Sequence, residues 1–249
     1  IEYIIISNET FKHFTVLNKI NKKFKNKKIL VEKPLFTKFR KFSSKNSNEI
    51  FVAYNLRFHP ALRELKEFIK NKKIWYLNVI CGSYLPYWRT NINYEDSYSA
   101  SKSRGGGVLL DLSHELDYIS WIFGLISCRY AEIKKISDLR IKSEDFVKIF
   151  GKIKKFDVHL ELNYFNKIPQ RQIKVDGKNF SLKIDLLKNQ NIFLIKNKKT
   201  QKIYTIKRND TYSMQHDDII INNGKNACKL AEGLKVLKFI KNIKNTANG

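Results

Sequence analysis

Cysteine is scarce in this sequence, and long apolar runs are missing from it. Only three cysteines occur among 249 residues, at Cys81, Cys128 and Cys228, and no two of them form a C-x-x-C pair. This spacing argues against a zinc site and against a disulfide framework, so we expect no metal, and reduced thiols as in a cytoplasmic protein. No apolar run approaches the roughly 20 residues that a membrane-spanning helix needs, so no membrane is expected as a partner.

Acidic residues are scarce as well. The chain has 23 Asp+Glu against 48 Lys+Arg, a formal charge of +25, and a pI near 9.9. Such an excess raises the question of nucleic acid. The lysines are spread along the chain, however, and no RNP-like aromatic motif, zinc finger or recognition-helix signature accompanies them. A basic nucleic-acid-binding protein therefore ranks last among three functional hypotheses.

The first quarter of the chain alternates between apolar runs and helix-forming segments. The runs YIIIS (3–7), KKILVEKP (27–34) and IFVAYNLR (50–57) are typical of strands that are covered on both faces. A helix is predicted over 10–22, and a short one after the second run. This alternation predicts a parallel sheet. Because the opening residues IEYIIIS already read as a strand, we expect the chain to begin inside a domain.

The rest of the chain follows a different pattern. Pro60 opens an amphipathic helix, and the segments that follow alternate apolar with polar residues, as strands with one wet face do. Strands are predicted over 74–84, 128–136, 145–153, 156–165, 171–177, 180–186, 191–197 and 202–208, and a closing helix over 223–243. The fold class is therefore α/β plus α+β: a partial Rossmann sheet in residues 1–58, then an antiparallel, open-faced sheet with helices on one side in residues 59–249.

A lysine stands at the end of the second run, in Glu32-Lys33-Pro34. Ligands of open parallel sheets bind beyond the carboxyl ends of the strands, which is where this lysine lies. The position suits a catalytic or binding cation, although in so lysine-rich a chain the tripeptide alone is also compatible with chance.

A second polar cluster lies in GGGVLLDLSHELDYISWIFG, residues 105–124. Three glycines lead into an apolar helix on which Asp111, His114 and Asp117 are spaced by three and so share one face. Buried polar groups are costly unless they are paired, and a histidine between carboxylates titrates near neutral pH. The alternatives are a hydrogen-bonded core histidine and a metal ligand.

Together these motifs resemble the family of glucose–fructose oxidoreductase, inositol dehydrogenase and MocA-type oxidoreductases. Members carry EKP at the end of a Rossmann strand and a GGG…D…H…D helix in the second domain. Three further segments are similar to the family's: IISNETFKHF (5–14), YNLRFHPALRELKEFI (54–69) and NACKLAEGLKVLKFI (226–240). The resemblance covers most of residues 1–165 and the closing helix, and it is faint between about 178 and 222.

The resemblance implies hydride transfer between NAD or NADP and a hydroxyl or carbonyl carbon of a sugar-like substrate. Such substrates include those of nucleotide-sugar and nonulosonic acid pathways. Lys33, His114 and Asp111 match the catalytic positions, with Lys33 at the reacting oxygen. The cofactor side is matched by Ser7, Asn8, His13, Glu32, Lys33 and Pro34. For the substrate we expect Arg57, Tyr84, Trp88, Arg89, Asp111 and His114, some of them in the polar-aromatic stretch 82–107.

Two features depart from the family pattern. The aspartate and histidine are usually four residues apart, whereas here Asp111 and His114 are three apart. No GxGxxG fingerprint or acidic ribose ligand occurs in the chain; both are expected ahead of IEYIIIS, in roughly 60–80 residues. We therefore expect a truncated member, and a non-catalytic subunit or remnant is the second hypothesis. The family's antiparallel sheet often forms an oligomer face, so a homo-oligomer is expected.

Overall fold

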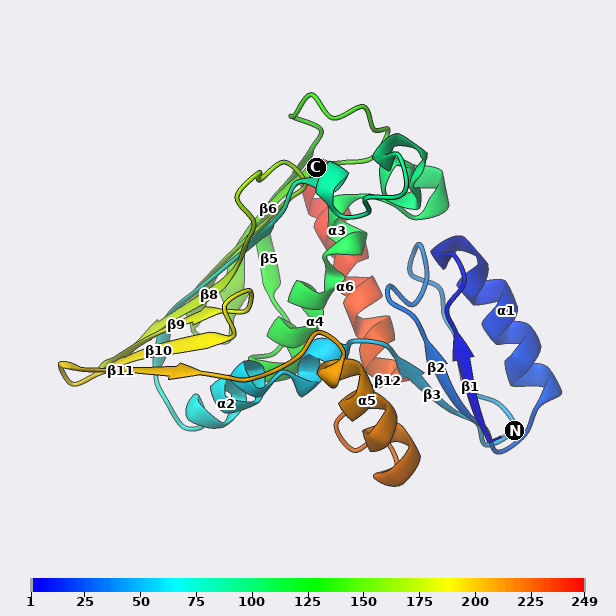
Figure 1. Cartoon of the computed structure of the whole chain (residues 1–249), viewed down its shortest axis with the longest axis horizontal. Coiled ribbons are helices and arrows are strands. Elements are labelled where there is room, and N and C mark those ends of the chain that lie inside the picture. Colours follow the sequence, from blue (N-terminus) through cyan, green and yellow to red (C-terminus); the bar gives the residue numbers. More distant parts are fainter. Residues whose placement is uncertain (1, 249) are drawn as a thin grey trace.

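Two sheets of different size organise the chain, with helices between them (Figure 1). The computed structural model describes residues 2–248. In Figure 1, α1 covers the outer side of the small sheet, while α3, α4 and α6 lie between the two sheets. The predicted combination of a small parallel sheet and a larger open-faced sheet is therefore confirmed.

The small sheet has the strand order β1-β2-β3-β12. Its strands are β1 (Tyr3–Ile6), β2 (Lys28–Val31), β3 (Glu49–Val52) and β12 (Cys228–Lys229). The first three are parallel, and β12 returns from far along the sequence to pair antiparallel with β3. Because Ile6 lies opposite Val31, the carboxyl ends of β1 and β2 meet at one edge.

The large sheet has the order β11-β10-β9-β8-β4-β7-β6-β5. Its strands are β4 (Ile74–Gly82), β5 (Ser127–Lys134), β6 (Phe146–Ile153), β7 (Phe156–Asn163), β8 (Gln170–Gly177), β9 (Phe180–Asp185), β10 (Gln190–Ile195) and β11 (Lys198–Ile203). Neighbours run antiparallel except for β4 and β7, which are parallel. Alternate residues of the central strands are buried, so one face packs against the helices while the other remains open.

The helices supply the layer between the sheets and the cover of the small one. The α-helices are α1 (Thr10–Lys23), α2 (Pro60–Phe68), α3 (Val108–Asp111), α4 (Ser113–Ile122), α5 (Asp210–Ile221) and α6 (Leu230–Asn248). The 3₁₀ turns are η1 (Asn55–Phe58), η2 (Leu85–Tyr87), η3 (Tyr94–Asp96), η4 (Tyr98–Ala100) and η5 (Lys102–Arg104). Among the described residues, no helix has the length and apolar character that crossing a membrane requires.

The short helix predicted after Pro34 is absent from the described chain. Residues 35–48 instead form a loop that two buried amides hold in place. Asn21 on α1 donates to the Ser43 carbonyl and accepts from the Lys45 amide, and Asn48 donates to the Asn21 carbonyl. Side-chain bonds to backbone groups thus replace the bonds that a helix would make.

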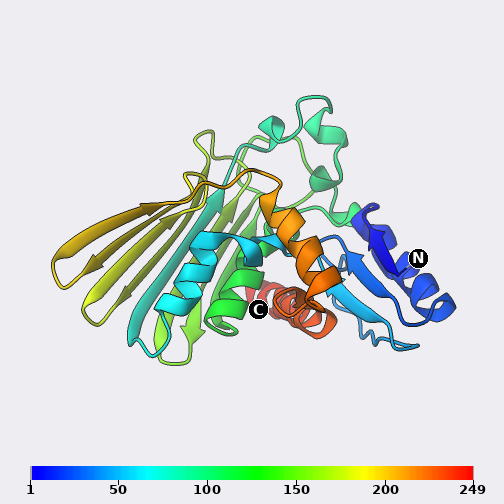
Figure 2. The same ribbon diagram turned by 60° about the horizontal axis from the view of Figure 1, so that its bottom comes forward.

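Other boundaries also differ from the prediction. The strand expected over 50–57 ends at Val52, the strand expected over 202–208 lies at Lys198–Ile203, and the closing helix begins at Leu230. Helix α5 was not predicted. Three of its four buried residues are polar (Thr211, Gln215 and Asp218), so no apolar periodicity marks the segment. Figure 2 shows α5 between α2 and the small sheet, where it packs against η1.

A buried cluster of charges joins η1, α4 and α6. The Arg57 guanidinium donates from Nε and Nη2 to the two carboxylate oxygens of Asp117, at 2.9 and 2.7 Å, and from Nη1 to Glu232 at 2.9 Å. Arg57 and Asp117 are both almost fully buried. A bidentate pair of this kind has strict geometry, so it fixes how the three elements sit against one another.

Replacing Asp117 with alanine leaves Arg57 buried with only the partly exposed Glu232 as a partner. We expect the free energy of unfolding to fall by about 3–5 kcal/mol. Glu67→Ala, which removes the exposed Glu67–Lys70 pair, is the control and is expected to cost about 0–1 kcal/mol. Urea unfolding monitored by circular dichroism measures both, and equal losses in the two variants contradict the role of the buried cluster.

Candidate functional site

The carboxyl ends of β1 and β2 bring four predicted cofactor residues together. The Glu32 amide donates to the Ile6 carbonyl, so the residues after each strand leave the sheet side by side. Ser7 and Asn8 follow β1 with exposed side chains, and Glu32 and Lys33 follow β2. The edge that the sequence predicted as a binding edge thus carries exposed polar groups.

His13 braces the two loops of this edge. Its ring is buried, with Nε2 2.8 Å from the Asn8 carbonyl and Nδ1 3.1 Å from the Pro34 carbonyl. The imidazole therefore lies behind the edge and connects the loop after β1 to the loop after β2. Pro34 is buried beside it, and the Lys33–Pro34 peptide is cis.

Lys33 reaches from the small sheet to the helix layer. Its ammonium donates to the backbone carbonyl of Asp111 at 2.6 Å, and its own amide donates to the Glu32 carboxylate. Burial lowers the pKa of Lys33, and the nearby carboxylates of Asp111 and Glu32 partly oppose that shift. The amine therefore gives up a proton more readily than an exposed lysine does.

The carboxylate of Asp111 faces the large sheet. Tyr164, which follows β7, donates its hydroxyl to Asp111 Oδ2 at 2.6 Å, while Oδ1 is buried without a partner among the described residues. The Tyr164 ring meets the edge of the Trp88 ring at 5.2 Å, and Trp88 Nε1 donates to Ser83. Trp88 thus packs against the tyrosine that bonds to Asp111 and makes its contact with the cluster through that ring.

His114 lies in the first turn of α4, with its ring edge against Tyr54 at 5.5 Å between ring centres. Burial lowers the pKa of His114 well below its usual range, and the positive charges of Lys33 and Arg171 lower it further. The imidazole is therefore neutral at physiological pH. Its Nδ1 is buried with no partner among the described residues, which leaves a hydrogen-bonding atom unused.

The single straight helix predicted for Asp111, His114 and Asp117 was wrong. The chain leaves helical geometry at Leu112, which has φ −94° and ψ 29°, so Asp111 ends α3 and His114 lies in the first turn of α4. His114 and Asp117 are still three residues apart on α4, where Asp117 is paired with Arg57. Of the three residues, the break sets only Asp111 apart.

Arg171 and Glu115 belong to the same cluster but were not singled out from the sequence. Arg171 on β8 donates from Nε to the fully buried Glu115 carboxylate at 2.7 Å. In the strand pattern RQIKVDG, an arginine at the start reads as an ordinary exposed residue, so no signal in the sequence marked it. Only the pairing of β8 with β4 places it under α4.

Of the remaining predicted substrate residues, Arg57 is held in ion pairs, whereas Tyr84 and Arg89 contact aromatic rings. Arg57 is occupied by Asp117 and Glu232, so its guanidinium is not free for a substrate. Tyr84 packs against Tyr87, and the Arg89 guanidinium lies 4.8 Å over the Tyr98 ring. Burial and the Asp111 charge raise the pKa of Tyr98.

The glycines of the GGG segment allow the loop to pass against the small sheet. A Cβ on Gly105 (φ 87°) would lie 2.6 Å from Thr37 Cγ2, and one on Gly106 would lie 2.2 Å from the Tyr98 carbonyl oxygen. Just before them, Arg104 forms an ion pair with Glu9, which follows β1. The loop and the first part of the chain are therefore in direct contact.

A cavity of about 270 Å³ opens beside His114. Its lining residues are Asn55, Leu56, His59, His114, Arg171, Leu186, Asn189, Ile206, Lys207, Arg208, Thr211 and Tyr212. A larger hollow of about 690 Å³ lies at the far ends of α2 and α4, among six lysines. Of the two, only the smaller cavity is lined by a residue of the Lys33–Asp111–His114 cluster, so we take it as the site.

The Tyr164 hydroxyl offers a direct test of this cluster. Tyr164→Phe leaves a buried carboxylate oxygen of Asp111 without its donor, so we expect a loss of about 1–3 kcal/mol in unfolding free energy. Tyr118→Phe is the matched control, because the Tyr118 hydroxyl is equally buried but has no partner among the described residues. Its removal is expected to be neutral or stabilising. Thermal and urea unfolding distinguish the two, and equal effects contradict the assigned bond.

No family model matches the sequence, and no curated protein matches it. Solved structures do. Levoglucosan dehydrogenase in complex with NADH has a TM-score of 0.85 at 17% identity, and the match covers 100% of this chain and 78% of that one. Aldose-aldose oxidoreductase from Caulobacter crescentus, complexed with glycerol, gives 0.82 at 14% identity, with 100% and 77% covered.

A third match is an inositol dehydrogenase homologue from Azotobacter vinelandii complexed with NADH and myo-inositol. Its TM-score is 0.77 at 14% identity, covering 100% of this chain and 76% of that one. Identities this low establish the fold alone. The resemblance predicted from the sequence is thereby confirmed at the level of architecture: this chain has the fold of the glucose–fructose oxidoreductase, inositol dehydrogenase and MocA-type oxidoreductases.

Proposed function

We propose that this chain belongs to an NAD(P)-dependent oxidoreductase that moves a hydride to or from a hydroxyl or carbonyl carbon of a sugar-like substrate. The observation that carries the proposal is Lys33. Its ammonium lies at the carboxyl end of a parallel strand, has a lowered pKa, and is oriented by Asp111 beside the neutral His114. Perturbed groups that converge next to a cavity are the usual sign of a catalytic centre.

Residues 1–58 are proposed as part of the nucleotide-binding domain and 59–249 as the domain for substrate binding and oligomerisation. The three parallel strands of the small sheet, β1, β2 and β3, all precede residue 59, which supports this division. β12 and α6 return to the small sheet, so the two domains are proposed to share one continuous core.

The residues at the edge of the small sheet fit one end of the cofactor. Ser7 and Asn8 are exposed beside Glu32 and Lys33, as polar ligands of a nicotinamide riboside should be. The loop between β1 and α1 contains no glycine, so the part of the chain that the structure describes offers no phosphate cradle there. Five of the matched solved structures hold NADH, which favours NAD(H) over NADP(H). When bound, the cofactor supplies or accepts the hydride.

The protein's own residues handle the proton. Lys33 is proposed to hydrogen-bond the reacting oxygen, giving it a proton in reduction and removing one in oxidation. Asp111 keeps the ammonium aimed through its carbonyl, and Tyr164 holds the Asp111 carboxylate. His114 lines the cavity and is neutral, and it is proposed to form a hydrogen bond with a substrate hydroxyl.

Lys33→Ala is expected to reduce hydride transfer by about 10²–10⁴-fold, the range for loss of a positioned acid–base group. In the reducing direction Lys33 must carry a proton, so the wild-type rate falls as pH rises through the Lys33 pKa. Because burial lowers that pKa, the fall occurs below the usual lysine range. Absorbance at 340 nm follows the reaction in the protein that carries these 249 residues.

Lys38→Ala serves as the control, since it removes an exposed lysine five residues away. NADH fluorescence separates binding from turnover in both variants. Turnover of Lys33→Ala within a factor of about two of the wild type, with the same pH profile, refutes the assignment of Lys33 as the acid–base residue.

A non-catalytic subunit is the alternative, and one observation favours it. β1 is an edge strand of the small sheet, and Ile5 on it is 50% exposed. An open strand edge with an apolar residue offers pairing to another strand. A chain that binds NADH and substrate but never transfers hydride would support this alternative.

The open face of the large sheet is proposed to form a homo-oligomer. Tyr130 and Phe150 are 50% and 39% exposed on neighbouring strands, and Phe150 stacks on His159 at 4.6 Å. A row of aromatics on the wet side of a sheet suits an interface better than solvent. The three free cysteines support a cytoplasmic location.

Phe150→Lys is expected to weaken self-association at least about tenfold, because a charge then replaces an aromatic ring at the interface. Ile203→Lys, on the edge strand β11 and 68% exposed, is the control and is expected to leave association unchanged. Sedimentation velocity across a range of concentrations measures both variants. A wild-type protein that stays monomeric at every concentration refutes the proposed interface.

A further inference from the structure

The cavity beside His114 is rich in hydrogen-bond donors that the protein leaves unused. We propose that it binds an anionic group of the substrate, a carboxylate or a phosphate, and so selects an acidic or phosphorylated sugar. This inference rests on the proposed function for the reaction, but its binding chemistry can be tested separately. In this proposal Arg171, Arg208 and Asn189 donate hydrogen bonds to the anionic group.

Arg171 supplies the strongest donor. Only its Nε is bonded, to Glu115, and its two terminal amino groups have no protein partner in the described part of the chain. The side chain is 23% exposed and lines the cavity, so these amino groups face it. Burial acts to lower the pKa of Arg171, yet the Glu115 carboxylate and other neighbours raise it overall, so the charge is permanent. Paired terminal N–H groups of a guanidinium match the two oxygens of a carboxylate or phosphate.

His59 and Asn189 add a donor of fixed orientation. His59 Nδ1 accepts from the Ala61 amide, so a neutral ring carries its proton on Nε2. That nitrogen lies 3.1 Å from the Asn189 side-chain oxygen and donates to it. Burial lowers the pKa of His59, which favours the neutral ring. The Asn189 oxygen is thus used, and its amino group is left to donate elsewhere.

Two further features give the cavity its charge. Lys207 and Arg208 line it from the segment before α5, and no aspartate or glutamate is among its lining residues. The Asn55 side chain donates to the Thr211 hydroxyl at 2.7 Å, which leaves the hydroxyl hydrogen free. Even when Glu115 is set against Arg171, two positive charges remain. Exposed cations alone are common in this chain; the partly buried Arg171 and the oriented Asn189 distinguish this group of cations from the others.

Size and position limit what can bind. A volume of about 270 Å³ is close to the lower end of the ~300–1,000 Å³ of small-molecule pockets, enough for one sugar with its anionic substituent. His114 lines the cavity, and the Lys33 ammonium donates to the Asp111 carbonyl three residues before it, so His114 connects the cavity wall to the Lys33 contact. An anionic group on Arg171 therefore places a neighbouring part of the same molecule toward Lys33.

Binding of glucose, glucuronate and glucose 6-phosphate to the protein, measured by calorimetry without turnover, tests the proposal. We expect at least one anion to bind about tenfold or more tightly than glucose, since charge-assisted hydrogen bonds of this kind contribute at least that much. The anion that binds more tightly identifies the carboxylate or the phosphate as the recognised group. Equal binding of all three sugars, or no binding of either anion, overturns the proposal.

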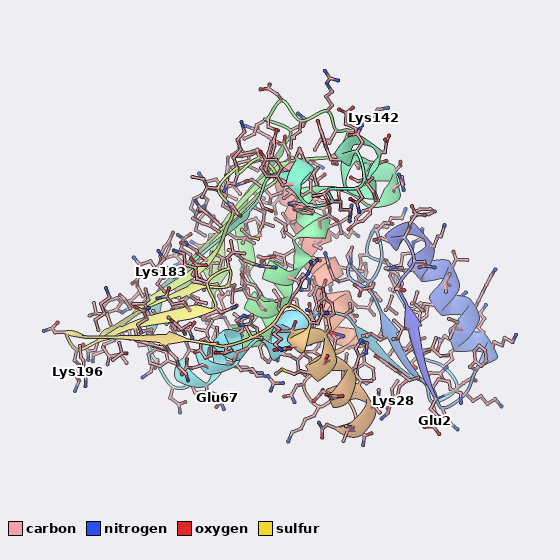
Figure 3. All side chains as sticks on the ribbon, in the orientation of Figure 1. Glu2, Lys28, Glu67, Lys142, Lys183 and Lys196 are labelled. Carbon is pink, nitrogen blue, oxygen red and sulfur yellow. The ribbon has the colours of Figure 1, made fainter. Side chains whose placement is uncertain are left out.

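Variants locate the site. Arg208→Ala is expected to weaken anion binding about five- to tenfold, because one cation of the cavity is lost. Lys196→Ala removes the same charge at the tip of the β10–β11 hairpin, far from the cavity (Figure 3), and is expected to change nothing. Equal effects of the two variants would indicate general attraction to a basic protein and would also overturn the proposal.

The double variant Arg171→Met/Glu115→Gln removes the buried pair together, so no lone charge is left inside. It is expected to lose the preference for anions over glucose while its melting temperature stays near the wild-type value. Retained preference contradicts the role of Arg171. Anion selectivity without hydride transfer in the wild type would refute the proposed oxidoreductase activity but not the anion site. Hydride transfer with glucose and with both anions at equal efficiency would refute the anion site but not the oxidoreductase activity.

Discussion

The buried pair between Arg57 and Asp117 is the constraint on which the arrangement of the molecule depends. It ties the 3₁₀ turn after β3 to α4, and through Glu232 it also ties that turn to α6. Since α4 carries His114 in its first turn and α6 follows the strand that completes the small sheet, one guanidinium helps to set the positions of both. The position of His114 relative to Lys33 therefore depends on this pair as well as on the bond from Lys33 to the Asp111 carbonyl. Burying a charge is costly because it loses its hydration. Here three hydrogen bonds from the Arg57 guanidinium to Asp117 and Glu232 offset that cost.

Unpartnered polar atoms are concentrated around this centre. Folded proteins leave few buried polar atoms without a hydrogen bond, and each such atom asks for an explanation. Asp111 Oδ1, His114 Nδ1 and Glu115 Oε2 are all in this state, within five consecutive residues. They come from the end of α3 and the start of α4, where the backbone breaks at Leu112. Only His114 of these three residues lines the cavity, so the unpartnered atoms lie behind its wall, whereas the terminal amino groups of Arg171 belong to the wall itself.

The sequence predicted the elements whose signals are local. Apolar runs marked β1, β2 and most strands of the large sheet, and Lys33 could be placed at a strand end because its neighbours are strongly apolar. What failed depended on contacts distant in sequence. Helix α5 buries Thr211 and Gln215, which look exposed in a hydropathy pattern. Arg57 looked like a free cation until Asp117 and Glu232 were seen around it, and Arg171 looked like a surface residue until β8 was paired with β4. Buried polar residues whose hydrogen-bond partners are distant in the sequence are marked by no local sequence pattern.

The way β12 closes the small sheet has a consequence for the order in which the protein assembles. β3 ends at Val52, but the strand that pairs with it, Cys228–Lys229, is made some 175 residues later in the chain. The central strand β4 likewise pairs with β7 and β8, which come later in the sequence than the glycine loop and α4. Contacts of such long separation must close large loops before they contribute stability, so neither sheet has its full complement of neighbours until most of the chain is present. The edges of β3 and β4 are open during that interval, and the abundant lysines, which keep growing chains apart by their like charge, are well placed to protect them from pairing with other molecules.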